Sequence, residues 1–419
     1  MRAFYSCLFY LLIPFILARL IWRSIKAPAY RYRWSERFAL YNRAFARNVI
    51  WLHAVSVGEA EALFPLVRQI QQQHPNAKLL ITTTTPTGSA RVKAVMQESV
   101  EHVYLPYDIP CAVSRFIQCF KPRIAVIMET EIWPNLFAYC GKNDIPLYII
   151  NARLSEGSAK GYQKIPALTS STLAHVKLIA AQTQDDANRF VAIGAQPARV
   201  KVLGNIKFDV KVPTEVTKQG LQLKAGLFED RFVWLIASTH KDEEAIFLEI
   251  YKKIKPEIPE LLLVIAPRHP ERFGEVKKLC EQHRLAVVLR TSDEACHHHT
   301  DIYLADTMGE LKLLYAAADV AFVGGSMVAV GGHNILEAAV VGTPIMFGPY
   351  MANFKDITEG ALRQNAAIQC QNNSEVVRTI IALYADSTYR QSLAEKGKTF
   401  VRQNQGAITG ILDILNQDI

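Results

Sequence analysis

Two glycine pairs in the second half of the chain are arranged as in many phosphate-binding loops. Gly-Gly-Ser occupies residues 324–326 and Gly-Gly-His occupies residues 331–333, between an apolar run at 320–323 and a helical pattern at 335–340. Glycine lets the backbone approach an anion, and the first N–H groups of a helix attract negative charge. Glu337, about one turn into that helix, could accept hydrogen bonds from ribose hydroxyls. The same residues would also suit a tight turn that only packs a helix on a strand.

A carboxylate that could act as a general base follows the first predicted strand. Glu59 comes directly after Gly58 and opens a helical pattern. Because the helix dipole and the free amides of a first turn favour the charged form, we expect Glu59 to be ionised near neutral pH. Its role would be either to remove a proton from a hydroxyl group or simply to cap the helix.

Acidic and basic residues also follow two later predicted strands. Glu129 and Glu131 come after the apolar run 124–128, and Lys207 follows a Gly-Asn pair at 204–205. Alternate residues of a strand point to opposite faces, so we expect only one of the two glutamates to face a ligand. Lys207 could balance an anionic sugar or a leaving group, or it could be an ordinary exposed lysine.

Two more segments could contact phosphate. Arg268 follows Pro267 in a rigid turn that could present its guanidinium to an anion. Residues 306–310 precede a helical pattern at 311–318 and offer a second helix N-terminus, or a plain helix cap.

Three consecutive histidines at 297–299 suggest a metal site at first sight. Consecutive side chains cannot all reach one ion without a strained loop, and no ligand set at zinc-site spacing accompanies them. An Asp-x-Asp metal motif is also missing, so we expect no metal. The seven cysteines are scattered and form no Cys-x-x-Cys pair, which is typical of reduced thiols in the cytosol.

Apolar runs alternate with helical patterns in both halves of the chain. Strands are expected at residues 49–53, 78–83, 102–105, 124–128, 147–150, 178–181, 200–203, 232–237, 261–266, 286–289, 319–323 and 344–347. This alternation predicts an α/β protein with two Rossmann-like domains, each built on a parallel sheet. The polar segment 211–222 lacks apolar periodicity and is the predicted linker, between domains at 26–210 and 223–419. The motifs above begin where predicted strands end, which is where such sheets bind ligands.

The N-terminus predicts a membrane anchor helix at residues 1–25. Residues 3–18 carry no charge, and with the apolar residues 20–22 they approach the roughly 20 residues that span a bilayer. No signal-peptide cleavage site follows, whereas six basic residues do, which keeps the rest of the chain cytoplasmic. The alternative is a buried core helix with a basic, solvated flank.

The charge balance favours a membrane surface or an anionic substrate as the partner. The net charge is +8, but the basic residues outside the N-terminal flank are spread along the chain and no nucleic-acid motif is present. We therefore expect no nucleic-acid partner.

Taken together and in order, the motifs resemble the 3-deoxy-D-manno-octulosonic acid (Kdo) transferases of lipopolysaccharide synthesis. The resemblance runs from the N-terminal anchor to near the C-terminus. It rests on HAVSVGE at 53–59, TTPTG at 84–88, METEIWPN at 128–135, NARLS at 151–155, GNIKFD at 204–209, APRHP at 266–270 and the glycine block.

The resemblance implies roles for particular residues. Glu59 would be the catalytic base, and Glu129 and Lys207 would act on the transition state. The CMP site would be lined by Pro267, Arg268, Met308, Gly309, Glu310, Asn334, Ile335, Leu336 and Glu337. Such proteins often carry proline where this chain has Ile335. Isoleucine keeps an N–H group and helical geometry, so we expect anion binding to survive.

The function implied is that of a membrane-anchored, metal-independent, inverting glycosyltransferase with no cofactor. Its two domains would face each other across a cleft, as in the GT-B architecture. It would move Kdo from CMP-Kdo to a lipid A precursor at the cytoplasmic face of the inner membrane. The alternatives are another sugar-nucleotide transferase or epimerase of the same fold, and a non-catalytic, membrane-tethered protein that binds a nucleotide sugar or a lipid. In the case of a non-catalytic binding protein, Glu59 could be replaced without loss of function.

Overall fold

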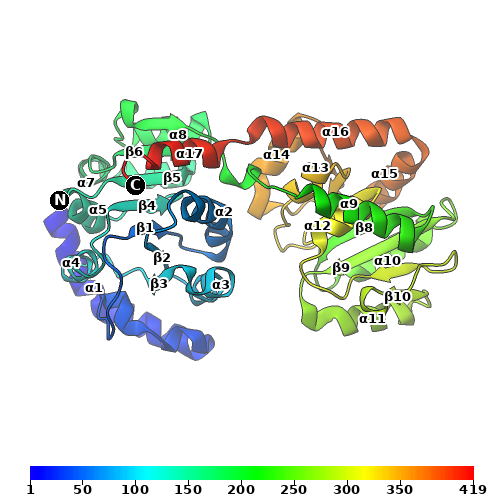
Figure 1. Cartoon of the computed structure of the whole chain (residues 1–419), viewed down its shortest axis with the longest axis horizontal. Coiled ribbons are helices and arrows are strands. Elements are labelled where there is room, and N and C mark those ends of the chain that lie inside the picture. The colour runs from blue at the N-terminus through cyan, green and yellow to red at the C-terminus, as the bar shows by residue number, and fades with distance from the viewer. The chain divides into compact units, whose positions relative to one another are not determined.

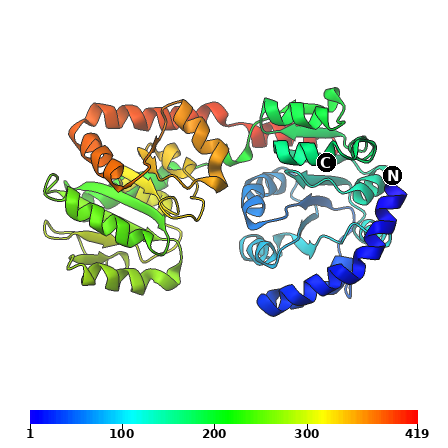
Figure 2. The same cartoon turned by 180° about the vertical axis from the view of Figure 1, so that it is seen from behind.

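The computed structural model describes residues 1–419, which form two compact units (Figure 1). Unit 1 comprises Met1–Asp209 and Gln405–Ile419, and unit 2 comprises Val210–Asn404. Each unit has one parallel sheet with helices on both of its faces, as Figure 2 also shows from behind. The predicted α/β class with two Rossmann-like domains is therefore confirmed.

Unit 1 contains a seven-stranded sheet in the order β3-β2-β1-β4-β5-β6-β7. The strands are β1 (Ile50–His53), β2 (Leu79–Thr83), β3 (Glu101–Tyr104), β4 (Ile124–Met128), β5 (Leu147–Ala152), β6 (Leu178–Ala181) and β7 (Val200–Val202). Every residue of β1, β2, β4 and β5 is buried, which explains their continuous apolar runs. Strand β1 pairs with both β2 and β4, so the strand order reverses at β1 and β4.

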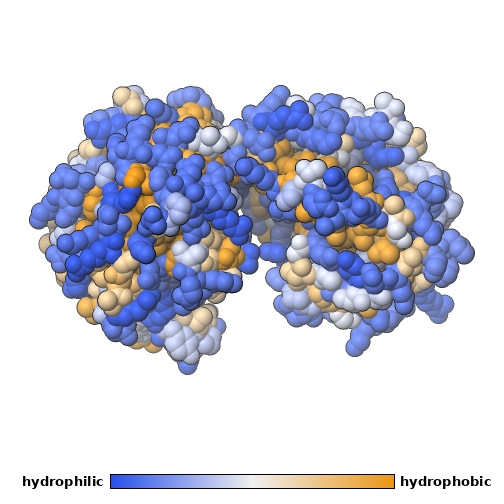
Figure 3. All heavy atoms as spheres, viewed as in Figure 1, coloured by the Kyte–Doolittle hydropathy of each residue, from blue (hydrophilic) through white to orange (hydrophobic).

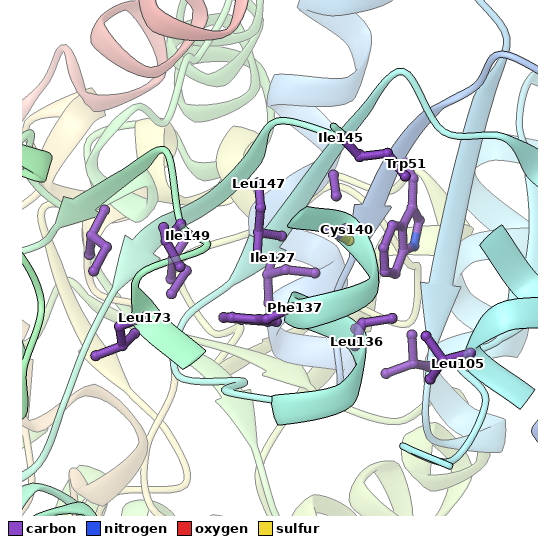
Figure 4. Close-up of a cluster of buried hydrophobic side chains, with 14 of the residues drawn as sticks. Trp51, Leu105, Ile127, Leu136, Phe137, Cys140, Ile145, Leu147, Ile149 and Leu173 are labelled. Atoms are coloured by element: carbon purple, nitrogen blue, oxygen red, sulfur yellow. The ribbon is translucent and has the colours of Figure 1, made fainter. Parts of the chain in front are cut away.

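The helices of unit 1 cover both faces of this sheet. They are α1 (Arg2–Lys26), α2 (Val57–Gln73), α3 (Pro86–Met96), α4 (Pro110–Phe120), α5 (Pro134–Lys142), α6 (Glu156–Tyr162), α7 (Pro166–Leu173), α8 (Gln184–Ala192) and α17 (Ala407–Leu415). Figure 4 shows how α5 packs Phe137 and Cys140 toward Ile127 of β4 and Leu147 of β5. This packing fixes the start of α5 beside the end of β4.

Unit 2 contains the second seven-stranded sheet, in the order β10-β11-β9-β8-β12-β13-β14. The strands are β8 (Phe232–Thr239), β9 (Leu261–Pro267), β10 (Val287–Leu289), β11 (Ile302–Leu304), β12 (Val320–Val323), β13 (Ile345–Phe347) and β14 (Ile368–Gln369). The helices are α9 (Thr214–Leu223), α10 (Glu243–Ile254), α11 (Phe273–Gln282), α12 (Leu311–Ala317), α13 (Leu336–Val341), α14 (Lys355–Arg363), α15 (Asn373–Ala385) and α16 (Ser387–Asn404). Here the strand order reverses between β8 and β12.

The segment predicted to be a linker, residues 211–222, is instead mostly the helix α9 of unit 2. Helix α9 packs on α12, and Gly220 makes this contact possible. A Cβ at Gly220 would lie 2.5 Å from the Cβ of Ala316 and 2.7 Å from the Leu313 carbonyl oxygen. The glycine that suggested a loop therefore serves close packing between two helices.

The C-terminal end also differs from the predicted boundaries, because residues 405–419 belong to unit 1. Both carboxylate oxygens of Asp209 accept hydrogen bonds at the start of α17, from the amides of Gly406 (2.6 Å) and Ile408 (2.7 Å). The apolar face of α17, including Ile411 and Leu415, is buried in the core of unit 1.

Helix α1 lies along the outside of unit 1, beside α5 (Figures 1 and 2). It is long and apolar enough to cross a membrane, by length and composition. One side of it nevertheless contacts unit 1, where Leu20 and Ser24 are buried.

Candidate functional site

Glu59 lies at the start of α2, just beyond the carboxyl end of β1. Ser56 caps this helix by accepting a hydrogen bond from the Glu59 amide (3.3 Å). In return the Ser56 hydroxyl donates to one carboxylate oxygen of Glu59 (3.0 Å), and the Val55 amide donates to the other (2.8 Å). The carboxylate is thereby held in one orientation, and each oxygen retains lone-pair capacity for a further partner.

Burial raises the pKa of the Glu59 carboxyl above its usual range, and the nearby charge of Glu129 adds to this rise. The hydrogen bonds from Val55 and Ser56 oppose it without cancelling it. The capping interactions favour the charged form, as expected, but desolvation has the larger effect on the pKa, so the net shift is upward; ionisation of Glu59 near neutral pH stays a prediction. A carboxylate with a raised pKa is a better proton acceptor than an exposed glutamate.

Glu129 and Glu131 lie beyond the end of β4, where the backbone has left the strand. Glu129 has a left-handed conformation (φ 57°), and its amide donates to the Ile150 carbonyl oxygen (3.0 Å). The strand alternation used to separate the two glutamates therefore does not apply to them. Burial raises the pKa of Glu131 to about 7, and the charges of Glu59 and Glu129 contribute. The charges of Glu59, Glu129 and Glu131 influence one another, and that only one of Glu129 and Glu131 faces a ligand stays a prediction.

The indole N–H of Trp133 donates to the Glu131 carboxylate (2.9 Å). This hydrogen bond favours the charged form of Glu131, but burial has the larger effect on its pKa. Glu131 is therefore a group of unit 1 that can change protonation near neutral pH.

Lys207 lies in a short 3-10 turn, η5 (Ile206–Phe208), that packs against α2. Asn205 caps the turn by accepting from the Lys207 amide (3.0 Å). The side chain of Asn151, at the end of β5, accepts from the Ile206 amide (3.1 Å). These bonds fix the turn of Lys207 to the carboxyl edge of the sheet that also carries Glu59.

In unit 2, the first glycine pair is held from inside by a carboxylate. Glu243, at the start of α10, accepts hydrogen bonds from the amides of Gly325 (2.7 Å), Ser326 (3.1 Å) and Met327 (3.0 Å). Burial raises the pKa of the Glu243 carboxyl, and the hydrogen bonds from these amides reduce this rise without cancelling it. The three amides are therefore occupied by Glu243, and a phosphate bound at this loop would have to contact other N–H groups. Gly324 is required for space, because a Cβ there would lie 2.7 Å from the Ser238 carbonyl oxygen.

Three histidines gather at the carboxyl ends of β8, β9 and β12. The Nε2 atoms of His240 and His333 are 2.8 Å apart, and their rings are stacked with centroids 5.0 Å apart. The ring of His269 lies edge-on to His240, with centroids 5.5 Å apart. Burial lowers the pKa of His333 to about 4, and the neighbouring His240 and Arg268 lower it further. His240 and His333 therefore resist gaining positive charge, because burial lowers the pKa of both rings.

Pro267 and Arg268 lie where β9 ends. Pro267 pairs with Thr239 of β8, and the Arg268 amide donates to the Thr239 carbonyl oxygen (3.0 Å). The neighbouring Glu244 is buried and binds Arg272 (2.5 and 3.1 Å). The ion pair anchors the turn that presents Arg268.

The remaining predicted donor-site residues lie at the starts of two short helices. Gly309 has a left-handed conformation (φ 89°), and Met308 is 53% exposed. Glu310 binds the guanidinium of Arg290 (3.0 and 3.1 Å).

At the second of these helices, the side chain of Asn334 accepts from the Leu336 amide (3.0 Å), and Ile335 and Leu336 are fully buried. Glu337 lies 3.9 Å from the ammonium group of Lys312. Asn334 and Glu337 are thus the polar side chains of the segment 334–337, while Ile335 and Leu336 belong to the core.

The histidine run 297–299 lies away from these residues, before β11. The rings of His297 and His299 stack at 5.7 Å, and the His297 carbonyl oxygen accepts from Arg231 (2.7 Å). No group of three or more His, Cys, Asp or Glu side chains in the chain is placed to hold a metal ion.

Comparison with known proteins shows that the chain is similar to members of one family. A family model for "3-Deoxy-D-manno-octulosonic-acid transferase (kdotransferase)" matches residues 32–210. The 3-deoxy-D-manno-octulosonic acid transferase of Haemophilus influenzae is 38% identical over 99% of this chain and 98% of its own length. The transferase of the same name from Bordetella pertussis is 34% identical over 87% of this chain and 86% of its own length. The chain belongs to the Kdo transferase family.

The fold of this Kdo transferase is shared more widely. The crystal structure of a UDP-GlcNAc 2-epimerase from Neisseria meningitidis covers 88% of this chain and 99% of its own, with a TM-score of 0.56 and 15% identity. At that identity the likeness shows the fold alone.

The residues implied by the family fall into two groups. Glu59, Glu129 and Lys207 lie around the carboxyl edge of unit 1, with the first two beside the switch point between β1 and β4. The proposed donor-site residues all lie in unit 2. Doubly wound sheets bind ligands at the carboxyl ends of their strands, next to the switch point, which is where Glu59 and Glu129 lie.

Sequence reasoning gave no role to Glu243, and it did not single out Glu131, His240 or His333 for the chemistry described here. Glu243 carries a usable signal, because it lies three residues after a strand-end histidine and opens a helix. The pairing of His240 with His333 has no local signal, since 93 positions separate them in the chain.

Proposed function

We propose that this Kdo transferase moves Kdo from CMP-Kdo to a lipid A precursor, with inversion at the anomeric carbon. The observation that carries the proposal is the cluster of Glu59, Glu129 and Glu131 at the switch point of unit 1, in a chain 38% identical to a Kdo transferase over nearly its full length.

Glu59 would act as the general base. Its oriented carboxylate would take the proton of an acceptor hydroxyl while that oxygen attacks the anomeric carbon of Kdo. The bond between the anomeric carbon and the phosphate oxygen would break, and CMP would leave as a phosphate monoester. The raised pKa of Glu59 and its fixed orientation support this role.

Glu129 and Lys207 would act on the transition state. The anomeric carbon gains oxocarbenium character as CMP leaves, and a carboxylate close to it is stabilising. Lys207 would balance negative charge on the sugar or on the leaving group.

The donor would bind in unit 2, and the acceptor would bind in unit 1. Arg268, at the end of β9, would contact the phosphate, and Glu337 would accept hydrogen bonds from the ribose hydroxyls. Pro267, Met308, Gly309, Glu310 and the segment 334–337 would complete the CMP site. No divalent metal is required in this scheme, because the guanidinium of Arg268 would balance the phosphate charge.

The N-terminal helix would hold the protein at the cytoplasmic face of the inner membrane. Its exposed apolar residues, such as Phe4 and Leu11, supply hydrophobic insertion, and Arg19, Arg23 and Lys26 supply attraction to anionic headgroups. The full-length protein should resist extraction by high salt and require detergent. At about 1 M salt, charge attraction is screened within about 3 Å. Release of the protein from membranes by such salt alone would refute the anchor.

The direct test of the reaction is an assay with radiolabelled CMP-Kdo and a lipid A precursor, with products resolved by size. We expect label to move to the lipid and CMP to be released in equal amounts. Lipid that stays unlabelled while CMP-Kdo binds would favour a non-catalytic binding protein, and conversion of the donor without transfer would favour an epimerase.

A further inference from the structure

Helix α1 is apolar on both sides, but only one side is covered by protein. The partly or fully buried positions recur every three or four residues, so they form one stripe along the helix. They are Tyr5, Ser6, Phe9, Ile13, Ile16, Leu17, Leu20 and Ser24. On the opposite side, Phe4, Leu11 and Phe15 are 73%, 72% and 71% exposed, and Trp22 is 56% exposed. A helix of this kind needs a second apolar neighbour.

The covered stripe is tied to unit 1 by polar contacts as well as by packing. The hydroxyl of Tyr5 hydrogen-bonds to the carboxyl group of Asp108. The hydroxyl of Ser6 donates to the side-chain oxygen of Asn135 (2.9 Å). Further along, Tyr10 beside this stripe lies near Cys111 of α4. The first three turns of α1 therefore have specific partners in unit 1.

These partners also fix the start of α5. The two oxygens of Asp108 accept from the amides of Asn135 (2.9 Å) and Leu136 (2.7 Å). Asp108 and Asn135 are 3% and 2% exposed, in part because α1 covers them. Removing α1 from this surface would uncover a buried carboxylate and leave Tyr5 and Ser6 without partners.

A helix that crosses the bilayer must leave the protein surface for about 30 Å of hydrocarbon. Helix α1 could do so only by giving up its contacts with Asp108 and Asn135 and by placing Ser6 and Ser24 in lipid. A helix that lies in the interface keeps these contacts and buries only its bare side, about 5–10 Å deep.

We propose that α1 is an in-plane membrane helix, which stays packed on unit 1 and inserts its opposite side into the cytoplasmic leaflet. The N-terminus then remains on the same side of the membrane as both units. The proposal rests on the membrane location proposed above and specifies how it is achieved.

Phospholipid fits the bare side of α1 better than a second copy of the chain does. Arg19, Arg23 and Lys26 line one border of that side, and Lys26 lies over the ring of Trp22, 4.3 Å from the ammonium to the centroid. Cations and an interfacial tryptophan beside apolar residues match anionic headgroups above acyl chains. In a symmetric self-contact, the same cations would meet like charges. Figure 3 shows orange and pale hydrophobic atoms mixed with hydrophilic ones along the lower left margin of unit 1, where α1 runs.

The side of the membrane that holds the N-terminus decides between the two orientations. Arg2→Cys would be introduced into a chain in which the exposed Cys7 and Cys111 are replaced by serine. A membrane-impermeant maleimide should label this variant in inverted vesicles at least about 10-fold more than in intact spheroplasts. Labelling mainly from the periplasmic side would overturn the in-plane orientation. Kdo transfer, measured on the same membranes, reports separately on the proposed function.

A disulfide test checks the packing of α1 in the membrane and has a matched control within the chain. Ser6→Cys with Asn135→Cys and Cys7→Ser should cross-link under mild oxidation in native membranes, because the two side chains are in contact. Asn135→Cys alone leaves the native Cys7, which is one position further along and exposed, and should cross-link at least about 10-fold less. Equal cross-linking of both variants, or none in an active and folded protein, would contradict the packing.

The identity of the covering surface is tested with Leu11→Cys carrying an environment-sensitive fluorophore, in vesicles of phosphatidylethanolamine and phosphatidylglycerol. Brominated acyl chains should quench the fluorophore most strongly when the bromine is near the headgroup end of the chain. Strongest quenching by bromine at the bilayer centre would indicate a spanning helix. Absence of quenching, together with disulfide-linked dimers of the unlabelled Leu11→Cys protein, would show that a second copy covers this side.

Discussion

Replacing Glu59 by glutamine should separate catalysis from folding in this protein. The structure allows glutamine to satisfy the same neighbours, since its carbonyl oxygen can accept from the Val55 amide and its amide group can donate to the Ser56 hydroxyl oxygen. The cost to the free energy of unfolding should therefore be under about 1 kcal/mol. Loss of the general base should lower turnover by about 100-fold or more, equivalent to about 2.7 kcal/mol of transition-state stabilisation.

Ser56→Ala is the matched control, because it removes the helix cap and one hydrogen bond to the carboxylate of Glu59, but keeps the carboxylate and its hydrogen bond from the Val55 amide (2.8 Å). It should cost about 1 kcal/mol of stability and leave turnover within a few-fold of the parent. The two variants should thus show opposite patterns in a Kdo-transfer assay and in urea unfolding followed by circular dichroism. Turnover of Glu59→Gln above about a tenth of the parent value would remove Glu59 from the role of base.

Four further outcomes follow from the contacts described above. Because the pKa of Glu131 rises from 4.5 to about 7 on folding, protons favour the folded state there, and stability should fall as pH rises from about 4.5 to 7; Glu131→Gln should flatten that part of a pH series of urea midpoints. Glu243→Ala should lower the free energy of unfolding by at least about 3 kcal/mol, because three buried amides lose their acceptor, and Glu243→Gln should recover part of the loss in the same measurement. Transfer activity should persist in excess EDTA, and alanine at His297, His298 and His299 together should leave it nearly unchanged; activity restored only by a divalent ion would refute the metal-free scheme. Arg268→Ala should raise the Michaelis constant for CMP-Kdo by about 10-fold or more while that of the acceptor stays within about 2-fold, and the reverse pattern would place the donor in unit 1.

The parts of the fold that could be predicted are those in which a local pattern decides the structure. Buried parallel strands need continuous apolar residues, so β4 and β6 have the bounds that the sequence suggests. Strands β11 and β14 were not predicted, because three and two residues carry too little pattern. The polar helix α9 was taken for a linker because its main contact with unit 2 is made through a glycine, and glycine reads as a loop signal.

Prediction of the site from the sequence has the same limit, because only features set by a local pattern could be predicted. The position of Glu59 could be predicted because a strand, a small residue and a helix start follow one another in the chain. The direction of the pKa shift of Glu59 could not be predicted. It depends on desolvation by burial, which only the folded chain supplies, and on the charge of Glu129, about 70 positions away. The occupation of the Gly-Gly-Ser amides by Glu243 was missed for a similar reason, because the two segments meet only through the pairing of β8 with β12.

The return of α17 to unit 1 has a consequence for how the protein is made. A ribosome releases residues 1–209 first, yet the core of unit 1 includes Ala407, Ile408, Ile411, Leu412 and Leu415, which are the last to emerge. All of unit 2 has left the ribosome by then, so it can fold before the unit that precedes it is complete. Until α17 has been synthesised, nascent unit 1 exposes the apolar surface that this helix covers, so the final stabilisation of unit 1 comes after the synthesis of unit 2.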